Sequence, residues 1–124
     1  MLIGILAFQG DYSLHQKILD KLNVNHILVK NTTSLFNSDG LIIPGGESTV
    51  MSKMIYENKM ENHLISYSKK KSIYGTCAGA IIMSSKIKDN IVQPLKIINV
   101  QVYRNSWGRQ IHSFKENVKL SFSK

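Results

Sequence analysis

The sequence predicts an α/β protein with a doubly wound, mostly parallel sheet flanked by helices. Short runs of apolar and β-branched residues alternate with segments whose apolar residues recur every three or four positions, which is typical of such sheets. Three of the runs end in glycine-containing turns, where open α/β sheets bind their ligands. The 124 residues, 43% of them hydrophobic, suffice for a modest core.

The first run, Leu2–Phe8, is almost continuously apolar, as expected of a strand buried on both faces of a parallel sheet. A helix is expected to begin near Ser13, which can act as its N-cap, and to stop at Asn23. The apolar residues of this segment fall at helical spacing, at Leu14, Ile18 and Leu22.

The next two strands are expected at His26–Val29 and Gly40–Ile43, because both runs are short and rich in β-branched residues. The stretch between them, Asn31–Asp39, is polar and rich in turn-forming residues, so we expect a loop there. The predicted order up to this point is strand, helix, strand, strand.

Two helical segments follow, Ser48–Glu57 and Glu61–Lys71, and their apolar spacing fits either one broken helix or two short ones. Residues Ser72–Gly75 form the fourth expected strand. An apolar helix is expected directly after it, at Ala78–Ser85.

The last part of the chain contains three β-like stretches with partial alternation, at Leu95–Tyr103, Gln110–Phe114 and Val118–Phe122. No repeat, low-complexity tract or linker divides the sequence, so residues 1–124 are expected to form one domain. The final stretch is not followed by the helix that the alternation predicts. We therefore expect this domain to be incomplete at its C-terminus.

Charge and hydropathy exclude several classes of function. The net charge of +8 is high, but the lysines are scattered, which favours a solvated basic surface over nucleic-acid binding. No apolar run approaches the ~20 residues of a membrane span, and Leu2–Phe8 lacks the features of a signal peptide, so a cytoplasmic protein is expected. No His, Asp and Glu spacing suggests a metal site.

A cysteine lies in the turn between a predicted strand and a predicted helix, Gly75–Gly79. This pattern corresponds to a nucleophile elbow with cysteine in place of serine. The glycines permit a tight turn, and the N–H dipoles of a helix starting at Ala78 favour the thiolate. Cys77 is therefore a candidate nucleophile, and a small cysteine buried at a tight junction is the alternative.

A second glycine-rich turn, Pro44–Thr49, also follows a strand and opens a helix. Two successive glycines let a backbone N–H point outward, as an oxyanion donor must. A turn with a capping box, with Ser48 or Thr49 as the cap, fits equally well. If both turns lie at the carboxyl ends of parallel strands, they can supply a nucleophile and an oxyanion hole to one substrate.

Both arginines of the chain lie in one segment, Arg104–Gln110, and every other basic residue is a lysine. A planar guanidinium suits the carboxylate of a small substrate. The alternative is a β-turn around Trp107 with the arginines in surface ion pairs. The histidines lie outside these motifs and are expected at the surface or the edge of the core: His15, His26, His63 and His112.

In these motifs the sequence resembles the class I glutamine amidotransferases, and in particular the glutaminase subunits of the two-component pyridoxal 5′-phosphate (vitamin B6) synthase. Ile81 separates it from other class I members, which usually have a glutamine there. The resemblance implies a flavodoxin-like three-layer fold. It rests on four segments in the family's order and at about its spacing: Ile3–Asp11, Pro44–Thr49, Gly75–Gly79 and Arg104–Phe114.

The resemblance implies that Cys77 attacks the side-chain amide of L-glutamine and that the N–H groups of Gly46 and Ala78 form the oxyanion hole. Arg104 would then bind the α-carboxylate of glutamine, and Glu47 would accept from its α-ammonium group. The residues implied to surround the amino-acid end of the substrate are Gly46, Glu47, Ser48 and Arg104, with Gln9 near the site.

A partner is also implied, a (β/α)8-barrel synthase subunit that receives the ammonia and builds the vitamin from a pentose phosphate and a triose phosphate. No cofactor is expected in the glutaminase itself. Family members carry their catalytic His and Glu in a His-Pro-Glu motif and contact glutamine through an Ile-Arg pair, and nothing in Val118–Lys124 resembles either. The alternative to an active glutaminase is therefore an inactive chain that only binds the synthase.

Overall fold

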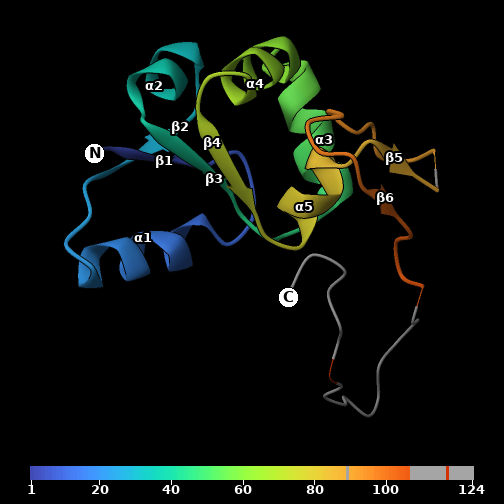
Figure 1. Ribbon diagram of the computed structural model, residues 1–124, viewed down its shortest axis with the longest axis horizontal. Helices are drawn as coiled ribbons and strands as arrows, with labels where there is room; N and C mark the ends of the chain where they lie inside the picture. Colours follow the sequence, from blue (N-terminus) through green and yellow to red (C-terminus); the bar gives the residue numbers. More distant parts are fainter. Residues whose placement is uncertain (89, 107–116, 118–124) are drawn as a thin grey trace.

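The computed structural model describes residues 1–88, 90–106 and 117. A four-stranded parallel sheet forms its centre, with the strand order β2-β1-β3-β4 (Figure 1). The first four expected strands and the predicted α/β class are confirmed. The strands are β1 (Ile3–Leu6), β2 (His26–Val29), β3 (Gly40–Ile43) and β4 (Ser72–Gly75).

Helices cover both faces of this sheet. Figure 1 shows α1 (Tyr12–Lys21) on one face and the helices α2 (Thr32–Asn37), α3 (Ser48–Glu57) and α4 (Glu61–Ser68) on the other. A shorter helix, α5 (Ala78–Met83), follows β4 and packs against α3. The main core lies between the sheet and the layer formed by α2, α3, α4 and α5. Its buried side chains include Leu6, Val29, Leu41, Ile43, Met51, Ile55, Leu64 and Ile82.

The loop expected at Asn31–Asp39 is wrong, because the structure has the helix α2 there. Asn31 and Ser34 form a reciprocal capping box, in which the backbone N–H of Ser34 donates to Asn31 Oδ1 at 2.9 Å. Leu35 is the residue of this helix that is fully buried in the core. The same polar residues that suggested a turn therefore cap a short helix, and the order becomes strand, helix, strand, helix, strand.

The ends of the other helices differ in detail from the expected ones. The first helix begins at Tyr12 with Asp11 as its N-cap, not at Ser13. The two segments after β3 form separate helices, because Lys59 between them adopts a positive φ of 55° that no α-helix can contain. Both the helix expected at Glu61–Lys71 and the one expected at Ala78–Ser85 end earlier than predicted.

The strand expected at Leu95–Tyr103 is mostly wrong. Within this stretch only β6 (Gln101–Val102) is a strand, and it pairs in parallel with β5 (Lys86–Ile87). The two residues of β5 are too few to give a pattern of alternating hydrophobicity. Leu95 and Ile97 instead donate their N–H groups to carbonyls at the end of α5. The stretches expected at Gln110–Phe114 and Val118–Phe122 lie outside the described residues.

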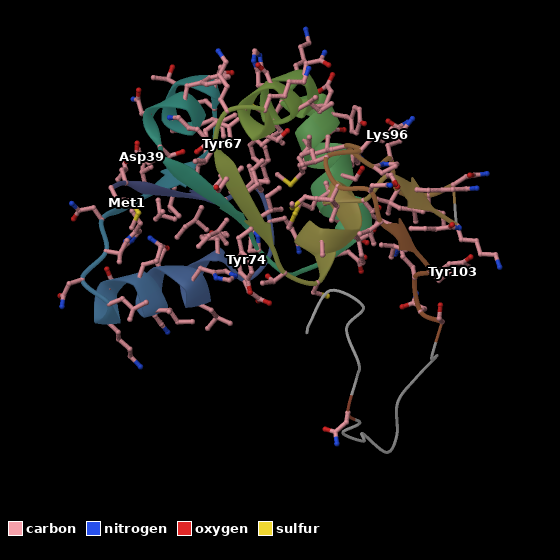
Figure 2. The ribbon with its side chains drawn as sticks, in the orientation of Figure 1. Met1, Asp39, Tyr67, Tyr74, Lys96 and Tyr103 are labelled. Carbon is pink, nitrogen blue, oxygen red and sulfur yellow. The ribbon has the colours of Figure 1, made fainter. Side chains whose placement is uncertain are left out.

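A buried polar contact joins the end of α2 to Tyr67 of α4, which is labelled in Figure 2. The hydroxyl of Tyr67, a residue that is only 1% exposed, lies 2.9 Å from Ser38 Oγ and donates to the Ser38 carbonyl at 3.2 Å. Lys71 Nζ donates to the carbonyls of Ser38 and Phe36. Burial raises the pKa of Tyr67 above its ordinary value. These bonds fix the chain just before it enters β3.

Candidate active site

The strand order places a topological switch point between β1 and β3. The connection from β1 leads to β2 on one side, and the chain then crosses β1 to reach β3 on its other side. Ligands of open α/β sheets bind at such a switch point, at the carboxyl ends of the strands. The loop after β4 leaves from the same edge, because β4 is parallel to β3 and adjacent to it.

Cys77 lies in a strained turn after β4. It is exposed, and its φ of 47° and ψ of −106° are unusual for a residue with a side chain. The N–H of Thr76 donates to the Ile43 carbonyl at 3.1 Å, and the Thr76 carbonyl accepts from Gly79 at 2.9 Å. The alternative of a buried cysteine is therefore wrong, and the thiol is open to a reactant.

The two glycines of this turn are required by close packing of backbones. A Cβ at Gly79 would lie 2.2 Å from the carbonyl oxygen of Ile43, and a Cβ at Gly75 would lie 2.8 Å from the carbonyl carbon of Gly79. Neither contact can be relieved by rotating a side chain. The glycines thus let α5 begin directly against β3, which brings Cys77 to the end of the sheet where the loop after β3 also lies.

The loop after β3 lies beside the cysteine. A Cβ at Gly45 would be 3.6 Å from Cys77 Cβ, within van der Waals contact. Gly46 has a φ of 146°, and a Cβ there would meet Gln9 Oε1 at 2.7 Å. Gln9 Oε1 accepts the N–H of Glu47 at 3.1 Å, so the loop after β1 supports this loop.

The capping-box alternative for this loop is wrong. The N-cap of α3 is Glu47, and no side chain caps the helix. Ser48 is only 4% exposed, at the first position of the helix, and Thr49 donates to Glu47 Oε1 at 3.2 Å. Within the described residues, the N–H groups of Gly46 and Ala78 donate to no protein acceptor. Both N–H groups are thus available to a ligand.

Arg104 lies shortly after β6, and its side chain reaches Glu47 in the loop after β3. Its side chain is only 13% exposed, and Nη2 lies 3.9 Å from Glu47 Oε1. It borders a cavity of about 300 Å³ together with Lys88, Tyr103 and Ser106. Arg104 lies in a turn and pairs with the exposed carboxylate of Glu47, so the alternative of a turn with ion-paired arginines also fits this residue. Arg109, Trp107 and the rest of the second half of that motif lie outside the described residues.

The histidines differ in their surroundings. His26 lies 3.7 Å from Asp20, His63 packs edge-on against Phe36, and His112 lies outside the described residues. His15 is half-buried, as expected of a histidine at the edge of the core, and its Nε2 lies 3.5 Å from Thr76 Oγ1, next to the cysteine.

Residues 1–88, 90–106 and 117 contain no group of three or more His, Cys, Asp or Glu side chains arranged for a metal ion. The helices in that part of the chain are too short or too polar to cross a membrane.

Comparisons with known proteins identify the family of the chain. The sequence model of the SNO glutamine amidotransferase family matches residues 5–123. The pyridoxal 5′-phosphate synthase subunit PdxT of Oenococcus oeni is 38% identical over 95% of this chain and 62% of its own length. The corresponding subunit of Thermotoga maritima is 38% identical over 97% of this chain and 64% of its own length. The chain thus spans less than two thirds of these relatives.

A solved crystal structure described as a glutamine amidotransferase superposes with a TM-score of 0.82 and 36% identity, over 92% of this chain and 62% of that one. A putative peptidase E protein from Listeria monocytogenes superposes with a TM-score of 0.67 over 79% of this chain and 63% of that one, at 13% identity. The second likeness concerns the fold alone.

Proposed function

The chain belongs to the SNO glutamine amidotransferase family, and we propose that its Cys77 attacks the side-chain amide of L-glutamine. The observation that carries this proposal is the short distance between the two turns: the position that a Cβ would take at Gly45 lies 3.6 Å from Cys77 Cβ, so the exposed cysteine stands beside the loop after β3. The bond from sulfur to the amide carbon forms, the carbon–nitrogen bond breaks, and ammonia leaves with one added proton. Water then cleaves the thioester to glutamate and restores the thiol.

The N–H groups of Gly46 and Ala78 would stabilise the oxyanion of the tetrahedral intermediate. Both are available, since neither donates to a protein acceptor among the described residues. Preorganised N–H donors of this kind act where charge develops and need no reorganisation during the reaction. Gln9 supports this arrangement because it accepts from Glu47, the residue after Gly46.

Arg104 and Glu47 would bind the amino-acid end of glutamine. Their charged atoms lie 3.9 Å apart, so a positive and a negative group stand side by side, as the α-carboxylate and α-ammonium groups of the substrate do. The guanidinium can hold the carboxylate with two parallel hydrogen bonds. Ser48, at the start of α3, completes the proposed substrate-binding set with Gly46.

The ammonia would pass to a synthase subunit with a (β/α)8 barrel, the partner expected for glutaminases of vitamin B6 synthesis. The names of the relatives support this partner, because they describe subunits of pyridoxal 5′-phosphate synthase. An alternative is a chain that binds the synthase without hydrolysing glutamine.

A glutamine analogue with a thiol-alkylating diazoketone tests the nucleophile. We expect mass spectrometry to find one adduct on Cys77, and we expect L-glutamine to protect against it. Cys77→Ala is the matched control and should take up no label, while Ser84→Ala, a buried position in the turn after α5, should label as the parent does. Labelling that glutamine does not slow would overturn the proposal. An ammonia-release assay with the synthase subunit present then separates an active glutaminase from the binding-only alternative.

A further inference from the structure

The first turn of α1 contacts both loops that form the proposed site. The N–H of Asp11, the N-cap of this helix, donates to the carbonyl of Gly45 at 3.0 Å. Four residues later, His15 Nε2 lies 3.5 Å from Thr76 Oγ1. Residues four apart lie on the same side of a helix. One side of α1 therefore meets the glycine loop and the cysteine turn together.

The cysteine turn needs support from its surroundings. A residue with a side chain at the φ and ψ of Cys77 is strained, and such a conformation persists only where neighbouring contacts over-determine it. The backbone of Thr76 is fixed by hydrogen bonds to Ile43 and Gly79. Its side chain has His15 as its hydrogen-bond partner. Because threonine is stiff about χ1, a bond to Oγ1 also restrains the backbone of the residue before Cys77.

We propose that His15 is a positioning residue, which restrains Thr76 and thereby keeps Cys77 in the turn that places the thiol beside Gly45. The effect of His15 on the reactivity of Cys77 rests on the proposed function, whereas its restraint of Thr76 does not. Among the described residues, His15 forms no ion pair with a carboxylate, whereas His26 does. A histidine base of a nucleophile is normally oriented by a third group. The half-buried ring of His15 has a hydroxyl partner instead, which suits a positioning role.

Amide hydrogen exchange tests this role without any turnover. In the 124-residue chain, His15→Ala should speed exchange at the amides of Thr76 and Gly79 about tenfold, as expected from the loss of one hydrogen bond. His15→Gln offers an amide nitrogen near the position of Nε2 and should restore the rates. The amide of Leu64, which donates to Met60 in α4, is the internal control and should not change. His63→Ala, on the exposed side of α4, is the control variant.

A double-mutant cycle shows whether His15 acts through the hydroxyl. Thr76→Val removes Oγ1 and keeps the shape, so it should speed exchange at Gly79 as much as His15→Ala does, and the double variant should be no faster than either. Unchanged exchange at Thr76 and Gly79, an equal rise at Leu64, or additive effects in the double variant would each overturn the proposal.

The diazoketone analogue then measures the catalytic consequence. His15→Ala should lower the maximal rate of Cys77 alkylation without changing the concentration that gives half of it, and His15→Gln should restore the rate. If His15→Gln lowers the rate of alkylation as much as His15→Ala does, and the remaining rate no longer follows the pH profile of the parent chain, His15 is a base and the positioning role is wrong. If the parent chain is not alkylated by the analogue at all, the proposed function fails, while the exchange rates still decide the role of His15.

Discussion

Replacing Gly79 by alanine should separate the cysteine turn from β3. The added Cβ would lie 2.2 Å from the carbonyl oxygen of Ile43 and 2.9 Å from its carbon, so two backbones must move apart. Overpacking of a core costs about 1–3 kcal/mol, and a contact between backbones belongs at the upper end of that range. Alanine is about 1 kcal/mol better than glycine inside a helix. The net loss of unfolding free energy should therefore be about 2 kcal/mol.

Urea denaturation followed by circular dichroism measures this loss. With a slope of about 2 kcal/mol per molar urea, the midpoint should fall by about 1 M. Gly40→Ala is the matched control, because a Cβ at Gly40 would meet its nearest neighbour, Ile3 Cδ1, at an ordinary 3.5 Å. It should be at least as stable as the parent chain, since alanine loses less entropy on folding. Equal stability of Gly79→Ala and Gly40→Ala would refute the packing argument.

Three further outcomes are expected. Arg104→Lys keeps the charge but loses the two-pronged hydrogen bond, so calorimetry should show glutamine binding weakened about tenfold; an unchanged Kd would make Arg104 structural. Burial raises the pKa of Tyr67 in the folded state, so the contribution of Tyr67 to stability is present below pH ~10 and is lost as the pH rises through the folded pKa. Tyr67→Phe should lower the free energy of unfolding by about 1 kcal/mol at pH 8 and should make this free energy depend less on pH up to pH 11. In an ammonia-release assay with the synthase subunit, Cys77→Ala should lose at least ~10²-fold of any activity that the parent chain shows, because no neighbouring group can form the thioester, and a rate near that of the parent would refute the nucleophile.

The central sheet was predictable because its strands carry a strong pattern. The runs His26–Val29 and Gly40–Ile43 are apolar, β-branched and bounded by polar residues, and the structure has strands at those residues. The helix α2 was not predictable in the same way, since Asn31 and Ser34 occur both in turns and in capping boxes. Which of the two forms depends on Leu35, whose burial in the core is a tertiary contact.

The candidate site was partly visible in the sequence. The glycines around Cys77 and the pair Gly45 and Gly46 stood out, and the structure brings them together because their strands are neighbours. The contact of His15 with Thr76 could not be read in advance. The contact depends on which side of α1 faces the edge of the sheet, and a histidine at the same position of the sequence could equally have faced solvent.

The strand order has a consequence for how the protein folds. Gln9 and Glu47 are 38 residues apart, and Cys77 reaches the same edge only after β4 has paired with β3. Contacts between distant parallel strands form slowly, because each requires a long loop to close first. No local segment that folds early can therefore contain the assembled site. Reactivity of the thiol toward a glutamine analogue should return during refolding only in the last kinetic phase, when the fourth strand joins the sheet.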